Sequence, residues 1–361
     1  MIAVSPLPCI KNLSQDELKL YFNSIGAEPY RAKQFFKEFY QKSPLAFDYI
    51  PTLPKILKEQ LTTHYAPTSM QISKQTTSAD GTIKFLFELA AGGFVESVLI
   101  PSEMRNEEGL PKRKTLCISS QVGCQLGCKF CATASLKLQR SLSLAEIVDQ
   151  FFYAQSYTES PITNVVFMGM GEPMLNYETV MKSVELLTDS SLAILSPKRI
   201  TVSTAGVVPG IVKMADEQRQ IKLALSLHAT TNGLREKLMP ISKKWNISAV
   251  MDALEYYYQK TRIPLTFEYI LFEGLNDSLV DVKRLAKFTR RFPSKVNIIP
   301  FHPIDFTLPT GFAASLQPTS AIAFQQFQQQ LLDNDVTVMI RSSSGVDIDA
   351  ACGQLAFSNA S

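Results

Sequence analysis

Three cysteines stand close together near the middle of the chain. Cys124, Cys128 and Cys131 are spaced C-x3-C-x2-C within the segment SSQVGCQLGCKFCATA. Thiolates this close in sequence can converge on one small centre, and their softness favours an iron–sulfur cluster or zinc over hard cations. A structural zinc site normally has four ligands, and the sequence places no fourth cysteine or histidine close by. The spacing therefore favours a cluster with one iron open to a further ligand, with zinc or unliganded thiols as the alternatives.

Three more side chains could take part in a reaction. Cys117 lies in a β-rich run before Cys124, and Cys352 lies in GVDIDAACGQL near the end of the chain. Taken alone, both are interpreted as small core residues, because free cysteines are often buried. Glu96, in FVESV, is a carboxylate within a β-rich run, and on a solvent-facing side it would need no explanation.

Polar residues also stand where several β-rich runs end. Gly171 and Glu172 follow one run within GMGE, Ser203 ends the next, and Ser226-Leu227-His228 ends another. In parallel α/β proteins the reactive groups gather at the carboxyl ends of the strands. Alone, however, G-x-G marks only a tight turn, and the serines and the histidine could be ordinary polar residues at strand ends.

The composition is that of a globular chain. Of 361 residues, 45% are hydrophobic and 19% are charged, so a sizeable core can be buried and disorder of the whole chain is excluded. The net charge, 36 − 33 = +3, is too small to identify a nucleic-acid partner. Six cysteines are too few for a disulfide-stapled secreted scaffold. No run approaches the ~18 apolar residues of a membrane span, and MIAVSPLPCIKNLS does not resemble a signal peptide, so we expect a cytoplasmic protein.

The first two regions precede the cysteine motif. Residues 1–68 are expected to form an N-terminal helical accessory domain, in which Ser14 and Glu17 make a capping-box signature. A second helix is expected to start near Pro29 and run through RAKQFFKEFYQK. Residues 69–101 are expected to form a small β meander, with a turn at Asp80-Gly81.

Residues 102–345 alternate β-rich and helical runs. The expected strands are 115–119, 163–168, 199–203, 222–227, 265–271, 295–299 and 336–341. Amphipathic runs such as LAEIVDQFFYAQ, preceded by a second capping box at Ser143 and Glu146, separate them. This alternation predicts βαβ units and a parallel sheet. Six or seven units are too few for a closed eight-unit barrel, so the predicted fold class is α/β with an open or partial barrel. Residues 346–361 form a C-terminal segment that carries Cys352.

The motifs together resemble a known family. C-x3-C-x2-C after the first strand of a βα array resembles the radical S-adenosylmethionine (SAM) superfamily. The segments CISSQVGCQLGCKFCAT, VVFMGMGEPMLNY, ITVSTAGVVPGI, LSLHATTNGLREKLMPI and DIDAACGQL resemble the RlmN/Cfr family of adenosine methyltransferases, and PYRAKQ extends the resemblance into the N-terminal region. The resemblance implies a partial (β/α)6 radical SAM barrel with an RNA-binding N-terminal domain and a small β extension.

The same resemblance implies a role for each candidate residue. Cys124, Cys128 and Cys131 would hold a [4Fe–4S] cluster whose open iron binds SAM. Glu96 matches the general base, Cys352 the methyl-accepting cysteine and Cys117 the second catalytic cysteine. The residues at SAM-contacting positions are Gly171, Glu172, Ser203, Ser226, Leu227, His228 and His302. The family usually has asparagine in place of His302, and Cys9 has no implied role.

The implied reaction consumes two SAM molecules per turnover. Cys352 takes the methyl group of the first by polar transfer. A reduced cluster cleaves the second to a 5′-deoxyadenosyl radical, which takes a hydrogen atom from the S-methyl group, and the methylene radical adds to an adenine carbon. Glu96 removes a proton from that carbon, and Cys117 attacks the sulfur of Cys352, which forms a disulfide and releases the methylated base. The radical is needed because an aromatic C–H carbon is not nucleophilic enough to take a methyl group from SAM directly.

The resemblance also supplies the partners. These are 23S rRNA and tRNAs modified at the adenosine next to the anticodon, with an electron donor such as flavodoxin, and we expect a monomer that has no membrane partner. Val122 before Gly123, and Pro173 after Glu172, resemble the branch that methylates C2 of adenine. The alternative within the family is a Cfr-type C8 methyltransferase. The alternative from a different class is a non-catalytic, zinc-containing RNA-binding protein.

Overall fold

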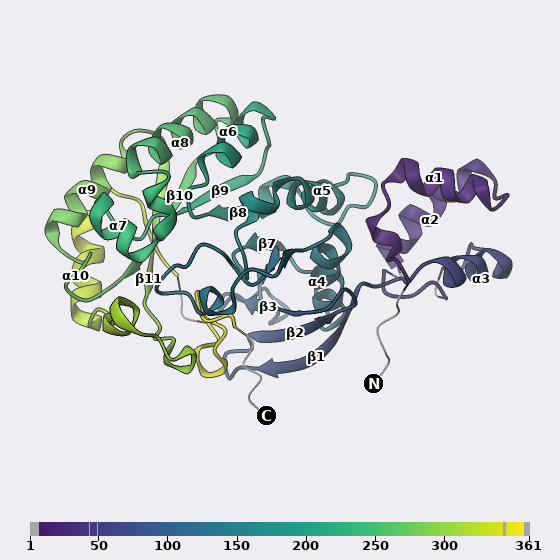
Figure 1. Cartoon of the computed structure of the whole chain (residues 1–361), viewed down its shortest axis with the longest axis horizontal. Helices are drawn as coiled ribbons and strands as arrows, with labels where there is room; N and C mark the ends of the chain where they lie inside the picture. Colours follow the sequence, from purple (N-terminus) through teal and green to yellow (C-terminus); the bar gives the residue numbers. More distant parts are fainter. Residues whose placement is uncertain (1–6, 43, 49, 342–343, 357–361) are drawn as a thin grey trace.

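A ten-stranded sheet runs through the molecule, with strand order β1-β2-β3-β4-β7-β8-β9-β10-β11-β12. The computed structural model describes residues 7–356 apart from 43, 49, 342 and 343. In the described part, the two outer strands β1 and β12 do not pair with each other, so the sheet curves without closing (Figure 1). The core is therefore the predicted partial barrel rather than a complete one.

Seven neighbouring strands of this sheet are parallel. They are β4 (Lys114–Cys117), β7 (Asn164–Phe167), β8 (Ile200–Thr204), β9 (Lys222–Ser226), β10 (Leu265–Leu271), β11 (Ser294–Pro300) and β12 (Val338–Ile340). Each falls on an expected strand, and six crossovers join them, which confirms the predicted (β/α)6 core. Their inner residues, such as Val165, Val202 and Leu223, are fully buried, as expected of strands covered on both faces.

The crossover helices lie along the outer side of the curved sheet (Figure 1). They are α4 (Leu144–Ser156), α5 (Tyr177–Leu187), α6 (Val208–Asp216), α7 (Asn232–Leu238), α8 (Ile247–Thr261), α9 (Leu279–Thr289) and α10 (Ala321–Leu332). Helix α4 begins at the predicted capping box, in which Ser143 accepts from the Glu146 amide while the Glu146 carboxylate accepts from the Ser143 amide. Among the described residues, no helix is long and apolar enough to cross a membrane.

Three antiparallel strands extend the parallel sheet. They are β1 (Met70–Thr77), β2 (Ile83–Leu89) and β3 (Phe94–Pro101). The β1–β2 hairpin turns at Asp80-Gly81, as the sequence predicted. Strand β3 pairs with β4 so that Val98 lies opposite Cys117. The meander is thus continuous with the core sheet, and a separate pair, β5 (Gln121–Val122) with β6 (Arg140–Ser141), frames the cysteine loop.

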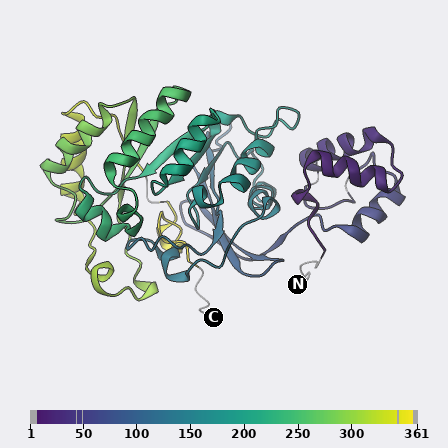
Figure 2. The ribbon, with the colours of Figure 1, turned by 45° about the horizontal axis from the view of Figure 1, so that its top comes forward.

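The N-terminal helices form a cluster at one end of the molecule (Figure 2). They are α1 (Gln15–Ser24), α2 (Pro29–Lys42) and α3 (Lys55–His64). The capping box at Ser14 and Glu17 starts α1, as predicted. The apolar face of α2 supplies the cluster's core, where the Phe35 and Phe39 rings stack with centroids 5.0 Å apart.

A buried ion pair attaches this helical cluster to the barrel. Lys11, just before α1, pairs with Asp149 of α4, and both side chains are fully buried. Asp149 also accepts 2.7 Å hydrogen bonds from the amide and hydroxyl of Ser69, and the Lys11 ammonium donates to the Pro67 carbonyl at 2.9 Å. All polar partners of the pair are thus supplied by the protein, as a buried charge requires.

Candidate active site

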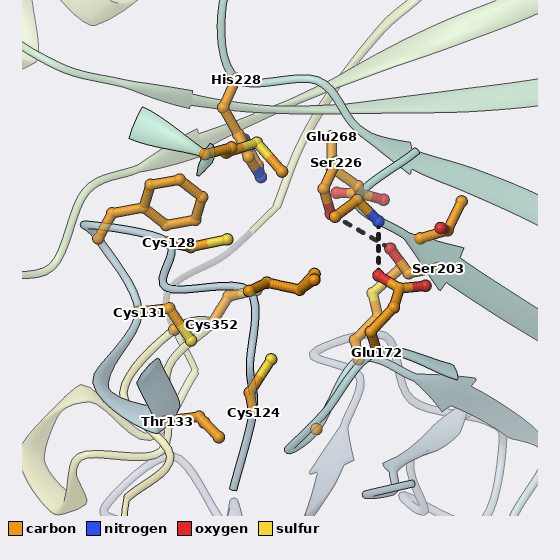
Figure 3. A pocket seen from close by; sticks show the side chains of 18 of the residues that line it. Cys124, Cys128, Cys131, Thr133, Glu172, Ser203, Ser226, His228, Glu268 and Cys352 are labelled. Atoms are coloured by element: carbon orange, nitrogen blue, oxygen red, sulfur yellow. Dashed lines mark hydrogen bonds between the residues drawn. The ribbon is translucent and has the colours of Figure 1, made fainter. Parts of the chain in front are cut away.

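The three motif cysteines lie on the loop that follows β4 and β5, and all three line one large cavity at the carboxyl ends of the strands (Figure 3). The loop is held on both sides: the Lys129 amide donates to the Leu238 carbonyl at 2.8 Å, and the Ala132 amide donates to the Gly353 carbonyl at 2.7 Å. We call this space, about 780 Å³ including its open mouth, the larger cavity. The loop therefore contacts both a barrel helix and the C-terminal segment.

Burial in the larger cavity keeps the three thiols protonated. It raises the pKa of Cys124 to about 12 and raises the pKa of Cys128 and Cys131 as well, and the neighbouring thiols raise those of Cys124 and Cys128 further. In the part of the chain that the structure describes, no three cysteine, histidine or carboxylate side chains are grouped as ready metal ligands. A bound cation would reverse this, because coordination favours the thiolate form.

Glu172 faces the cysteines across the larger cavity, as Figure 3 shows. Its carboxylate accepts from the Ala205 amide at 2.8 Å and from the Met174 amide at 3.1 Å. Burial raises its pKa to about 6, against these hydrogen bonds, which lower it. Gly171 is required here, because its φ is +94° and an added Cβ would lie 2.5 Å from the Cβ of Gln121. The glycine lets this loop pack directly on β5, the strand that leads into the cysteine loop.

The ends of β8 and β9 supply two hydroxyl groups and an imidazole. Ser203 and Ser226 both line the larger cavity with their hydroxyl oxygens 3.4 Å apart. His228 also lines it; its Nδ1 accepts from the Ile270 amide at 3.1 Å, and burial lowers its pKa to about 3, so the ring is neutral. Leu227 does not line this cavity, because its side chain is buried in the main hydrophobic core.

A smaller cavity adjoins the larger one, and two of the three catalytic candidates line it. Cys117 and Cys352 both line it, together with His302. Cys352 also lines the larger cavity, so one side chain borders both. His302, which the resemblance put among the SAM contacts, lines only the smaller cavity, and burial lowers its pKa.

Two charged residues of the site were not anticipated. Arg341, just after β12, lines both cavities and lies 3.7 Å from the carboxylate of Glu268, which lines the larger one. Burial raises the pKa of the Cys117 thiol to about 12, and Arg341 lowers it in part. Cys352 keeps an exposed surface, but the protein atoms packed around it raise the pKa of its thiol, and Arg341 again lowers it in part. Glu268 could have been recognised from the sequence, because a carboxylate within the apolar run LTFEYIL is unusual. The same feature singled out Glu96 in FVESV.

Arg235 of α7 is a third residue that the sequence did not single out. It is almost fully buried and donates to the carbonyls of Ala205 at 2.7 Å, Ser226 at 3.0 Å and Leu227 at 3.1 Å. These carbonyls lie where β8 and β9 end. The guanidinium therefore fixes the strand ends that carry the cavity's serines and histidine.

Glu96 lies on β3, buried but outside the lining of both cavities. It shares a face of β3 with Val98, which lines the smaller cavity, because alternate residues of a strand point the same way. Burial raises its pKa, and Lys84, whose ammonium lies 3.5 Å from Oε1, lowers it in part. Among the described residues, Glu96 Oε2 accepts no hydrogen bond.

These features define a class of enzyme. Three cysteines after the first strand of a partial barrel face a carboxylate and hydroxyl groups at the strand ends, and the family model of the Radical SAM superfamily matches residues 118–286. A second family model, the "Ribosomal RNA large subunit methyltransferase N-terminal domain", matches residues 10–66. Membership of the superfamily implies a [4Fe–4S] cluster and SAM.

Proteins that are similar over nearly the whole chain identify the family within this superfamily. The chain is 41% identical over 96% of its length to a "Probable dual-specificity RNA methyltransferase RlmN" of Salinibacter ruber, of which it covers 93%. It is also 41% identical to a "Dual-specificity RNA methyltransferase RlmN" of Geotalea uraniireducens, over 96% of each chain. A crystal structure of a radical SAM methyltransferase from Sphaerobacter thermophilus is 36% identical and matches with a TM-score of 0.88, over 96% of this chain and 99% of that one. The chain belongs to the RlmN family of radical SAM RNA methyltransferases.

Proposed function

We propose that the chain methylates C2 of a specific adenosine in 23S rRNA and of the adenosine next to the anticodon in tRNAs. The names of its relatives, which describe dual-specificity RNA methyltransferases, support two RNA substrates. Residues Val122 and Pro173, at the positions that resemble the C2 branch, support the choice of carbon over C8. The protein acts as a cytoplasmic monomer with an electron donor such as flavodoxin.

The position of Cys352 carries this proposal. Its side chain borders the larger cavity, with the three cysteines and Glu172, and also the smaller cavity, with Cys117. A cysteine that takes a methyl group from SAM and later forms a disulfide must reach both partners. Cys352 meets this requirement because it lines the cavity of the proposed SAM site as well as the cavity that contains Cys117.

The residues of the larger cavity fit the cluster and SAM. Three soft thiols on one loop suit iron, and the apolar side chains of Leu126, Phe130 and Met239 around them keep water away. Cys124, Cys128 and Cys131 would hold the cluster, and the Glu172 carboxylate suits the SAM amino group. Gly171, Ser203, Ser226 and His228 would hold the rest of the SAM molecule, with the backbone of Leu227; His302 is assigned to this set by resemblance alone. When bound, the cluster supplies the electron that cleaves SAM.

Cys352, Cys117 and Glu96 would carry the remaining steps. Cys352 takes the methyl group of one SAM as its thiolate, and its sulfur then bears the carbon that becomes bonded to adenine, with a second SAM consumed. Glu96 takes the proton from the attacked adenine carbon, and the one unpaired electron left in the adduct would return to the oxidised cluster. The Cys117 thiolate then attacks the Cys352 sulfur, so that the S–S bond forms as the S–C bond breaks, and the methylated base leaves with the electron pair and a proton.

RNA lacking the modification tests the proposal. Such rRNA and tRNA would be incubated without oxygen with reconstituted enzyme, SAM and a reductant, and the nucleosides would be separated against 2-methyladenosine and 8-methyladenosine standards. We expect 2-methyladenosine in both RNAs. Formation of 8-methyladenosine instead would establish the C8 alternative. A colourless protein that binds zinc, lacks iron and leaves SAM intact would point to the zinc-containing RNA-binding alternative.

A further inference from the structure

The tip of the β1–β2 hairpin contacts the C-terminal segment that carries Cys352. The Asp347 carboxylate accepts hydrogen bonds from the Ser78 hydroxyl at 2.5 Å and from the Ala79 amide at 3.1 Å. In return, Asp80 Oδ2 accepts from the Gly345 amide at 3.0 Å. Each of the two carboxylates thus accepts hydrogen bonds from a segment that is far away in the sequence. The bonds from Ser78 and Ala79 lower the pKa of Asp347. Burial raises the pKa of Asp80, but hydrogen bonds, chiefly from Thr82 within the hairpin and to a smaller extent from Gly345, give it a lowered value.

This contact is closely fitted. Gly345 has φ +69°, and an added Cβ would lie 2.8 Å from the Cβ of Ala350 and 2.9 Å from Cγ2 of Thr82 in the hairpin. Only glycine meets both requirements. The backbone of the C-terminal segment therefore lies directly against the hairpin.

The other end of the same segment is held by the cysteine loop. The Gly353 carbonyl accepts from the Ala132 amide at 2.7 Å, and the Leu355 carbonyl accepts from the Thr133 hydroxyl at 2.5 Å. Cys352 lies between these two attachments. Its place between the larger and smaller cavities is consequently fixed from both sides, by the hairpin at residues 345–347 and by the cysteine loop at residues 353–355.

Lys84 extends the hairpin attachment to Glu96. Its ammonium donates to the Asp349 carbonyl at 3.2 Å and lies 3.5 Å from Glu96 Oε1, and its side chain is 17% exposed. One cation thus contacts both the segment that carries Cys352 and the buried carboxylate on β3.

We propose that the hairpin tip (Ser78, Ala79 and Asp80) and Lys84 position the Cys352 segment for reaction, and that Lys84 ties the placement of this segment to the charge of Glu96. The inference rests on the proposed function for the roles of Cys352 and Glu96. In this proposal the β extension positions one end of the Cys352 segment. The cysteine loop, which belongs to the barrel, holds only the other end.

The direction in which Lys84 changes the pKa of Glu96 follows from the charges around that carboxylate. The charged groups that face Glu96 are Lys84 on β2, which lowers its pKa, and Asp349 in the C-terminal segment, which raises it, while burial is the largest cause of the raised value. Loss of Lys84 raises the pKa further, so a larger fraction of Glu96 is protonated at a given pH. A protonated Glu96 cannot accept a proton from the substrate.

Hydrogen–deuterium exchange of the reconstituted enzyme tests the positioning. We expect Asp347→Ala to speed amide exchange in residues 344–356 by about tenfold, because it removes two hydrogen bonds to a charged group. Ser78→Ala removes one of the two and should give a smaller change in the same direction. The matched control is Asp277→Ala, since Asp277 likewise accepts from a backbone amide, that of Gly274, and from a hydroxyl, that of Thr319. Unchanged exchange in both Asp347→Ala and Ser78→Ala would overturn the positioning role.

The pH dependence of product formation tests the link to Glu96. We expect the acid limb to move to higher pH in Lys84→Met and to return toward its original position in Lys84→Arg, which keeps the charge. If the acid limb of the pH profile stays in place in Lys84→Met, Lys84 does not influence the charge of Glu96 and this part of the proposal is refuted. If the unaltered enzyme yields no methylated adenosine, the proposed function fails instead, while the exchange measurement still decides whether the hairpin holds the Cys352 segment.

Discussion

Cys117, the last residue of β4, and Cys352, in the C-terminal segment, border the same cavity as free thiols. They are near enough for Cys352 to add to the raised pKa of Cys117, after the larger effect of burial. Cys117 also lies opposite Val98 on β3. The first parallel strand, the β extension and the end of the chain therefore meet at this pair.

Removing either thiol of this pair should stop the reaction at a different stage. Cys352→Ala should give no methylated base, because the methyl acceptor is lost. Cys117→Ala should accumulate a covalent protein–RNA adduct, because no thiolate is left to release the base. Labelled RNA on a denaturing gel distinguishes the two results. Cys9→Ala, a buried thiol outside both cavities, serves as the control, and release of free product by Cys117→Ala would refute the role of Cys117.

Arg341 and Glu268 should change thiol reactivity in opposite directions. Arg341 lowers the pKa of Cys117 and Cys352, whereas Glu268 raises that of Cys352. Each unit of pKa changes the thiolate fraction about tenfold when the thiol is mostly protonated. We therefore expect oxidant-driven formation of the Cys117–Cys352 disulfide, followed by peptide mass spectrometry, to be slower in Arg341→Met and faster in Glu268→Gln at the same pH. Equal rates in the two variants would show that this pair does not control the thiols.

The sequence predicted the barrel because each parallel strand is a short apolar run between amphipathic helices. The run at 265–271 coincides with β10 (Leu265–Leu271), and the other six strands differ by a few residues at their ends. The helix starts at Ser14 and Ser143 were predicted because a capping box is a local pattern. The spacing of hydrophobic residues and the capping box are both patterns within a few neighbouring residues, so a single sequence is enough to recognise them.

Contacts between distant segments could not be predicted in this way. Nothing in the sequence near Lys11 indicates Asp149 as its partner, and nothing near Asp80 indicates Gly345. Arg341 ends a predicted strand, yet its position beside two cysteines depends on the curvature of the whole sheet. The family resemblance assigns His302 to SAM, and only the structure shows that its side chain lines the smaller cavity, beside Cys117 and Cys352. Side-chain direction at the rim of a barrel is a property of tertiary packing.

The buried Lys11–Asp149 pair predicts a large loss of stability in one variant. Lys11→Met leaves the Asp149 carboxylate buried without its cation, which typically costs about 3–5 kcal/mol. Urea unfolding followed by circular dichroism measures the change in the free energy of unfolding. Lys19→Met, which breaks an exposed pair with Asp16, should have little effect. In the double variant Lys11→Met, Asp149→Asn, part of the loss should be recovered, because no unpaired charge remains. A double variant as unstable as Lys11→Met alone would mean that packing, not charge, dominates.

The ionisation of Glu172 should determine how SAM binding depends on pH. Burial raises its pKa to about 6, so the carboxylate that suits the SAM amino group is ionised above pH 6 and becomes protonated below it. We expect SAM affinity, measured by equilibrium dialysis with the reconstituted enzyme, to fall as the pH drops through about 6. Glu172→Gln should bind SAM at least about tenfold more weakly at pH 8, since a charge-assisted hydrogen bond is lost, and should lose the pH dependence.

His302→Ala is the comparison for this measurement. His302 lines the smaller cavity and not the larger one, so its loss should weaken SAM binding much less than Glu172→Gln does and should leave the dependence on pH unchanged. A loss of affinity as large as that of Glu172→Gln would instead place SAM in contact with His302, and SAM would then have to extend from the larger cavity past Cys352 into the smaller one. The two variants together therefore locate SAM relative to Cys352, the residue that must accept its methyl group.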